Sequence, residues 1–151
     1  MAIKKVLNKK KYAIVTGATR GIGYAIAERL INDGVTVLGT GTESLGSVPS
    51  GAKYHQVDFL DPLSLDQFIN KVSNLNVDIL VNNAGINKID EFDNILEEDF
   101  NKILDVNLKV PFLLCQRVIP HMKKMHWGRI INISSIFSHI SKEYRASYSS
   151  S

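Results

Sequence analysis

Short apolar runs alternate with stretches of helical periodicity along this chain. The run at residues 12–15 is uninterrupted and ends in a glycine-rich turn, which is typical of a buried strand. Four further strands are predicted at residues 35–40, 53–57, 77–81 and 129–133, which are apolar or rich in β-branched side chains. The hydrophobic pattern therefore predicts five short strands separated by longer segments.

Apolar residues recur every three or four positions between several of these strands. A helix is predicted from Ile22 onward, and Gly34 is a typical stop signal. Asp61 and Pro62 are typical of an N-cap and the first residue of a second helix. A long helix is predicted over about residues 97–124. Helices are thus predicted after three of the strands.

Strands that alternate with helices predict an α/β fold, in which a parallel sheet carries helices on both faces. Right-handed crossovers favour a Rossmann-type doubly wound sheet with strand order 3-2-1-4-5. Residues 43–52 hold two glycines and a proline, so this crossover is expected to be a loop. We expect residues 1–151 to be a single domain, because this length is ordinary for one.

Composition excludes several classes of protein. Hydrophobic residues make up 44% and charged residues 22%, as in ordinary globular domains. No apolar run approaches the ~20 residues of a membrane helix. The single cysteine, Cys115, favours a reducing cytoplasm. Four scattered histidines, two of them five residues apart on one helix, predict no metal site.

The net charge is +3, and part of the excess is concentrated near the start of the chain. These residues are Lys4, Lys5, Lys9, Lys10 and Lys11. No aromatic side chains alternate with them as a nucleic-acid platform would require. We therefore expect a solvated leader and no nucleic-acid partner.

A glycine-rich turn, residues 16–23, lies directly between the first strand and the first helix. Glycines permit a tight turn and a close approach of the main chain to a pyrophosphate, and the helix start offers free N–H groups. The competing phosphate-binding sequence, Gly-Lys-Ser/Thr, is absent. A purely structural glycine turn is the alternative interpretation.

Four ordered motifs resemble those of the short-chain dehydrogenase/reductase family, closest to its 3-oxoacyl-thioester reductases. They are Thr-Gly-x-x-x-Gly-x-Gly from Thr16, Asn-Asn-Ala-Gly from Asn82, Asn107 within the long helix, and the run from Arg129 to Ser135. The resemblance covers nearly the whole chain from about Lys11. It implies the Rossmann-type fold and a reaction that interconverts the carbonyl and alcohol forms of a small molecule.

The resemblance also implies the residues that contact a nicotinamide dinucleotide. They are Gly17, Thr19, Arg20, Gly21, Ile22, Gly23, Thr42, Asp58, Asn83, Ala84 and Gly85. NADP(H) is favoured over NAD(H), because no carboxylate stands at the end of strand two and Arg20 suits a 2′-phosphate, with Thr42 as a further donor. Glu43 lies just beyond that end. A solvated Arg20 and a plain turn role for Asp58 are the alternatives.

The catalytic residues implied by the resemblance are Asn107, Ser135 and Tyr148. The tyrosine exchanges a proton with the carbonyl oxygen, and the serine hydrogen-bonds to the same oxygen. Strand alternation should send Ser134 and Ser135 to opposite faces, and Ser135 has the family's spacing of thirteen residues before Tyr148. Pro111 has no N–H, so the Asn107 carbonyl should lose its helical partner.

The family's lysine, four residues after the tyrosine, would be residue 152, and the sequence ends at Ser151. We therefore expect the N-terminal part of a longer domain that is a homo-oligomer when complete, with little turnover by these residues alone. A non-catalytic dinucleotide-binding module and an inactive truncated fragment are the alternatives.

Overall fold

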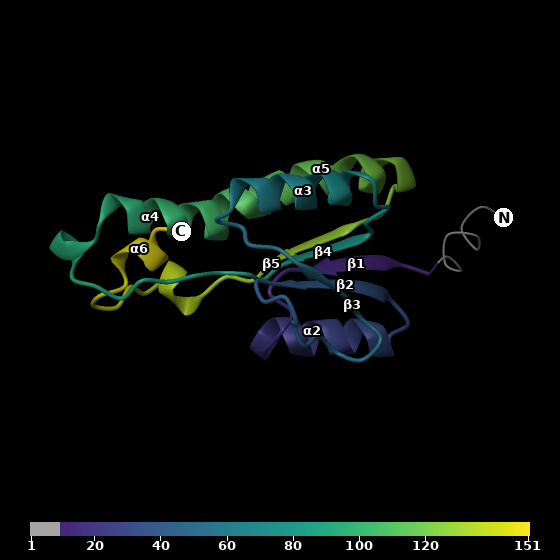
Figure 1. Cartoon of the computed structure of the whole chain (residues 1–151), viewed down its shortest axis with the longest axis horizontal. Helices are drawn as coiled ribbons and strands as arrows, with labels where there is room; N and C mark the ends of the chain where they lie inside the picture. Colours follow the sequence, from purple (N-terminus) through teal and green to yellow (C-terminus); the bar gives the residue numbers. More distant parts are fainter. Residues whose placement is uncertain (1–9) are drawn as a thin grey trace.

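A computed structural model describes residues 10–151, which form a parallel sheet between two layers of helices (Figure 1). The strands hydrogen-bond in the order β3-β2-β1-β4-β5, and every pairing is parallel. The predicted α/β class and strand order are confirmed. The strands are β1 (Tyr12–Val15), β2 (Thr36–Gly41), β3 (Lys53–Gln56), β4 (Ile79–Asn82) and β5 (Arg129–Asn132).

Helices cover both faces of this sheet. Helix α2 lies on one face, and α3 and α5 lie together on the other (Figure 1). The Asp61 side chain caps α3 by accepting from the Leu63 N–H at 3.1 Å, as predicted. Residues 43–52 contain no helix, which confirms the predicted loop. The helices are α2 (Gly21–Asn32), α3 (Pro62–Ser73), α4 (Glu97–Leu104), α5 (Val110–Met125) and α6 (Ala146–Ser149), with short helical turns η1 (Phe92–Asn94), η2 (Asp105–Lys109) and η3 (Ile136–Ser138).

The long predicted helix is correct in extent but not uniform. Its middle, η2, is a π-helical turn, and the Val110 N–H bonds back to the Asp105 carbonyl, five residues earlier. This wider turn accommodates Pro111, which has no N–H to donate. A freed Asn107 carbonyl stays a prediction.

Successive residues of the central strands pack into two separate cores. Ile14, Leu38 and Leu80 join Phe68 and Leu114 beneath α3 and α5. The neighbouring strand residues, among them Val15, Val37 and Val81, pack with Ala27 of α2. Burying each large side chain stabilises the fold by about 1.5–3 kcal/mol. Helices therefore pack against both faces of the central strands.

The start of β4 differs from the prediction, which placed a strand from Val77. The Asp78 N–H bonds to the Tyr12 carbonyl at 2.9 Å, while the Asp78 carboxylate accepts from the Tyr12 N–H at 3.0 Å. At this position the Asp78 side chain thus takes the Tyr12 N–H beside one backbone bond, and regular pairing begins at Ile79. The other predicted strand ends lie within one residue of those observed, and β1 agrees at both ends.

The expectation of a solvated basic leader is wrong for Lys11. Its ammonium lies 3.4 Å from the buried Asp78 carboxylate and 4.0 Å from the ring centre of Trp127. The His121 imidazole contacts the same carboxylate, with Nε2 3.6 Å from Asp78 Oδ1. Lys10 is exposed. Lys4, Lys5 and Lys9 lie outside the described residues.

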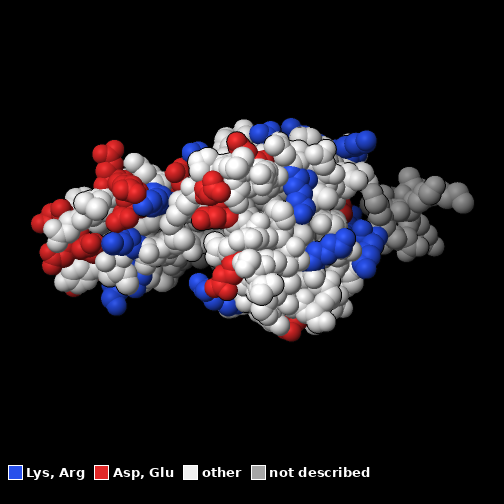
Figure 2. Space-filling view, viewed as in Figure 1, with Lys and Arg blue, Asp and Glu red and all other residues white. Residues whose placement is uncertain are grey.

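Charge is unevenly spread over the surface. Asp and Glu side chains crowd the end formed by α4 and the loop before it, at the left of Figure 2, while Lys and Arg predominate on the opposite end. The first turn of α4 alone holds Glu97, Glu98 and Asp99. Within residues 10–151, no helix is both long and apolar enough to cross a membrane.

Candidate functional site

Two cavities adjoin at the edge of the sheet where β1, β4 and β5 end. The first has a volume of about 650 Å³ and the second about 680 Å³. Both are within the ordinary range for small-molecule sites. They have five lining residues in common and so form one continuous cleft. The shared residues are Ile22, Asn83, Ala84, Gly85 and Ile86.

The glycine turn forms one wall of the first cavity. Gly17 and Gly21 have φ values of +64° and +56°, which side chains other than glycine adopt only with strain. Arg20 is the N-cap of α2 but provides no side-chain cap, and the first helical bond is donated by Tyr24. The N–H groups of the first helical turn therefore remain as donors for an anion.

Gly23 has a different purpose from the other two glycines. A Cβ at this position would lie 2.3 Å from the Gly17 carbonyl oxygen and 2.4 Å from Asn83 Nδ2. Gly23 does not line the cavity. It lets α2 pack closely against the turn, and its effect on a ligand is indirect.

Thr16 joins the glycine turn to the loop that follows β4. Its buried hydroxyl accepts from the N–H groups of Asn83 and Ala84 at 2.9 and 3.0 Å. The Asn83 amide in turn donates to the carbonyls of Thr16 and Gly17 at 2.9 and 3.0 Å. These bonds join the glycine turn to the Asn-Asn-Ala-Gly motif after β4 in one hydrogen-bonded unit. Sequence reasoning did not single out Thr16 beyond its place in the motif.

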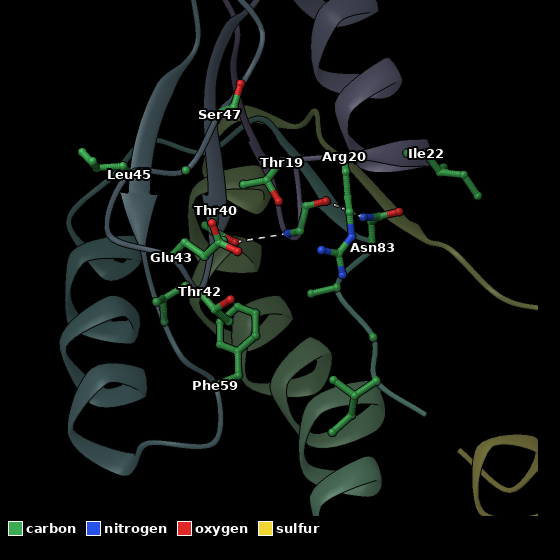
Figure 3. Close-up of a pocket in the computed structure, with 18 residues that line it drawn as sticks. Thr19, Arg20, Ile22, Thr40, Thr42, Glu43, Leu45, Ser47, Phe59 and Asn83 are labelled. Carbon is green, nitrogen blue, oxygen red and sulfur yellow. Dashed lines mark hydrogen bonds between the residues drawn. The ribbon is translucent and has the colours of Figure 1, made fainter. Parts of the chain in front are cut away.

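The end of β2 and the loop after it form the opposite wall. Thr40 Oγ1 accepts from the Gly17 N–H at 3.3 Å (Figure 3). Two β3 side chains hold the loop: Tyr54 Oη donates to the Glu43 carbonyl, and Gln56 Nε2 donates to the Thr42 carbonyl at 3.0 Å. Burial, and secondarily the Glu43 carboxylate, raise the pKa of Tyr54, which keeps the phenol a donor.

Most of the predicted cofactor residues line this first cavity. Asp58 does not; its Oδ1 accepts from the Leu60 N–H at 2.9 Å and it lies in the turn before α3. This placement matches the alternative interpretation of Asp58 as a turn residue. The predicted residues that line the cavity are Gly17, Thr19, Arg20, Gly21, Ile22, Thr42, Asn83, Ala84 and Gly85.

Opposite charges enter the first cavity from its two sides. Figure 3 shows Arg20 at the start of α2 and Glu43 beyond the end of β2, both among the lining residues. No ion pair joins them in the described part of the chain. Sequence reasoning placed Glu43 outside the site because it lies one residue past Thr42. The loop turns its side chain back into the cavity.

The second cavity brings the three predicted catalytic residues together from separate elements. Asn107 comes from η2, Ser135 is the N-cap of η3, and Tyr148 lies on α6. The Tyr148 ring packs edge-on against Phe137, with 6.3 Å between ring centres. Two hydroxyls and an amide thus line the same cavity.

Asn107 holds the loop between the two cavities. Its Oδ1 accepts from the Ile86 N–H at 2.9 Å, and its Nδ2 donates to the Ile86 carbonyl at 3.0 Å. The same Nδ2 donates to Ser151 Oγ at 2.9 Å. The amide therefore joins the loop after β4 to the residue that follows α6, a role that the Pro111 argument did not predict.

The alternation argument that separated Ser134 from Ser135 is wrong. Strand β5 ends at Asn132, so both serines lie in the following loop and both line the second cavity. Ser135 Oγ accepts from the Phe137 N–H at 3.3 Å, whereas Ser134 Oγ donates to Ser138 Oγ at 3.4 Å. Tyr144, the other tyrosine near the end of the chain, does not line this cavity.

Comparison with known proteins gives a consistent picture. The family model described as short chain dehydrogenase matches residues 11–151. A 3-oxoacyl-(acyl-carrier-protein) reductase of Aquifex aeolicus is 40% identical over 92% of this chain and 61% of its own length. The chain therefore spans about 60% of the length of the curated relatives it matches.

Two solved structures have the same fold. A metagenomic short-chain oxidoreductase in complex with NADP has a TM-score of 0.81 at 30% identity, with 93% of this chain and 68% of that one covered. A 4-hydroxyisoleucine dehydrogenase complexed with NADH has a TM-score of 0.82 at 27% identity, covering 93% and 63%. Both nicotinamide dinucleotides thus occur among similar structures.

Proposed function

Because the chain belongs to the short-chain dehydrogenase family, we propose that the whole protein interconverts a carbonyl compound and a secondary alcohol with NADP(H). The observation that carries the proposal is the continuous cleft. Its first cavity is lined by free helix N–H groups and the second by Asn107, Ser135 and Tyr148. A cofactor in the first would meet a substrate in the second.

The residues present fit a dinucleotide. A Cβ on Gly17 would lie 3.1 Å from the Ala84 Cα, so the bare backbone leaves room that a side chain would fill. The N–H groups of the first α2 turn suit a pyrophosphate. Asn83, Ala84 and Gly85 line both cavities, so they are suited to hold the part of the cofactor nearest the substrate.

The bound dinucleotide would supply or accept a hydride at the substrate carbon. Tyr148 Oη gives its proton to the carbonyl oxygen in reduction and takes it back in oxidation. The Ser135 hydroxyl hydrogen-bonds to the same oxygen and orients it. Asn107 fixes the Ile86 backbone, and with it the wall between cofactor and substrate. Positioned proton transfer of this kind contributes about 10²–10⁴-fold.

Arg20 and Thr42 favour the phosphorylated cofactor. A guanidinium binds a 2′-phosphate through paired hydrogen bonds, and a hydroxyl adds a further donor. Glu43 supports the second candidate, an NAD(H)-dependent enzyme, because a carboxylate in this cavity accepts from a ribose 2′-hydroxyl and repels a phosphate. Both charged side chains are exposed to solvent, so screening weakens their interactions alike. NADP(H) remains the proposal because Arg20 lies at the start of α2, where the free N–H groups of the helix also favour an anion.

Binding measurements test this choice. We expect wild-type protein to bind NADPH more tightly than NADH by calorimetry. Arg20→Ala should weaken NADPH by about 10–100-fold, because a hydrogen bond to a charged group contributes about 1.5–3 kcal/mol. Arg29→Ala, which removes an exposed arginine of the same helix, is the matched control. Equal affinities for the two cofactors, or an unchanged Kd for NADPH in Arg20→Ala, would contradict the proposed preference for NADP(H).

Turnover separates the enzyme from a non-catalytic dinucleotide-binding module. In the whole protein, Tyr148→Phe should abolish carbonyl reduction by at least about 100-fold and leave the Kd for NADPH unchanged. Tyr144→Phe, which removes a hydroxyl outside the cleft, should retain activity. Cofactor binding without turnover in the wild type would favour the module. The proposed homo-oligomer is checked by light scattering.

A further inference from the structure

The second cavity is nearly free of charge. Apart from Arg145, its polar lining consists of asparagine and serine side chains and Tyr148, and the other lining residues are apolar. Among the described residues that line it, Arg145 is the one that carries a formal charge. No carboxylate of the described chain forms an ion pair with it. Among the described residues, the cavity therefore contains a cation that has no ion-pair partner.

Local structure holds this cation near Tyr148. Arg145 is the N-cap of α6, and its carbonyl accepts from the Ser149 N–H at 2.8 Å. The guanidinium carbon lies 5.7 Å from the centre of the Phe137 ring, within the range of a cation–π contact. Phe137 also packs against Tyr148. The guanidinium and Tyr148 thus contact the same aromatic ring.

A half-buried guanidinium without a counterion is a binding site for an anion. Burial costs the cation part of its hydration, and an oxyanion that accepts a pair of its N–H groups restores that interaction. The planar fork matches a carboxylate in geometry. Arg145 and Tyr148 both contact the Phe137 ring, so they lie close to each other. A substrate that reaches both side chains would therefore be short.

We propose that the substrate is a short oxo acid or the matching hydroxy acid, whose carboxylate binds Arg145 while its carbonyl oxygen meets Tyr148. This inference rests on the proposed oxidoreductase function and adds the substrate class. Arg145 then selects the substrate and takes no part in proton transfer. Loss of the cation should act mainly on KM, since the carboxylate is bound equally before and during the reaction.

The test compares acids with their neutral counterparts in the whole protein. The probes are 2-, 3- and 4-oxopentanoate, each paired with its methyl ester, with NADPH as reductant. We expect at least one acid to exceed its ester in kcat/KM by tenfold or more. Arg145→Gln should reduce that acid-to-ester ratio about 10–100-fold through KM, and Arg145→Lys should restore part of it.

Lys142→Gln is the matched control, because it removes an exposed cation three residues away that does not line the cavity. Its acid-to-ester ratio should equal that of the wild type. The proposal is overturned if the esters react as well as the acids, or if Arg145→Gln leaves the ratio unchanged.

Calorimetric titration of the same acids and esters into the protein with NADPH provides a readout that does not need turnover. Tighter binding of an acid than of its ester, lost in Arg145→Gln, supports the carboxylate site even if no probe is reduced. Equal binding of both overturns it. Failure of the oxidoreductase proposal appears instead as absent NADPH binding or turnover, so the two outcomes are distinguishable.

Discussion

Gly23→Ala should damage the cofactor cavity without adding a side chain to it. The new Cβ would lie 2.3 Å from the Gly17 oxygen and 2.4 Å from Asn83 Nδ2. Ordinary contacts between heavy atoms are about 3.5–4.0 Å, so helix and turn must separate by about 1 Å. That movement strains the bonds from Asn83 to the Thr16 and Gly17 carbonyls.

The expected change in the free energy of unfolding combines two costs and one gain. Overpacking costs about 1–3 kcal/mol, and a weakened hydrogen bond costs about 1 kcal/mol. Alanine returns about 1 kcal/mol because it forms a helix more readily than glycine. The expected net loss in the free energy of unfolding is about 1–3 kcal/mol. Because the N–H donors of the turn move as well, the Kd for NADPH should rise at least about tenfold, or 1.4 kcal/mol.

Gly34→Ala is a control of matched chemistry at the other end of α2. Gly34 has φ +82° and nothing within 4 Å of a built Cβ, so alanine there costs backbone strain alone, about 1–2 kcal/mol. Urea unfolding followed by the fluorescence of Trp127 measures stability, and NADPH titration measures binding. Gly34→Ala should lose stability yet bind normally. Normal binding by Gly23→Ala would refute the close-packing argument.

Three further predictions concern the surrounding structure. Tyr54→Phe removes the donor to the Glu43 carbonyl, so the Kd for NADPH in calorimetry should rise about fivefold, the equivalent of roughly 1 kcal/mol; an unchanged Kd would show that the loop needs no such support. Asp61→Ala removes the α3 cap and should lower the free energy of urea unfolding by about 1 kcal/mol; no loss would contradict a capping role. Burial, and secondarily Lys71, lower the pKa of His55, so the unfolded state takes up a proton more readily and stability should fall as pH drops through about 6.5. His55→Gln should flatten that decline, and an identical decline in both proteins would exclude His55 as its source.

The arrangement of elements followed from local rules that the tertiary structure did not override. Uninterrupted apolar runs became central strands because both faces of such a strand are covered by helices. The proline and aspartate at the start of α3 capped it as expected. The start of β4 could not be foreseen, because it depends on the Asp78 carboxylate reaching Tyr12, 66 residues away.

The candidate site also contains residues that the sequence predicts and residues that it does not. The glycine turn and Asn83 were recognisable from ordered motifs that follow predicted strands, and Tyr148 from its spacing of thirteen residues after Ser135. Glu43 was named but placed outside the site, and Arg145 was not singled out, because both line the cleft through local conformations that no periodicity encodes. The two serines were separated by an alternation rule that ceases to apply where the strand ends.

The alternation of strands and helices, the crossover loop at residues 43–52 and the family motifs could be predicted from the chain, because hydrophobic period, caps and turn residues act over a few positions. The strand order then followed from the handedness of crossovers. Which side chains meet depends on the tertiary structure. Contacts such as Thr16 with Asn83, Tyr54 with the loop after β2, and Arg145 beside Phe137 depend on the packing of segments distant in the chain. Those contacts set the charge and shape of the cleft, and therefore what it can bind.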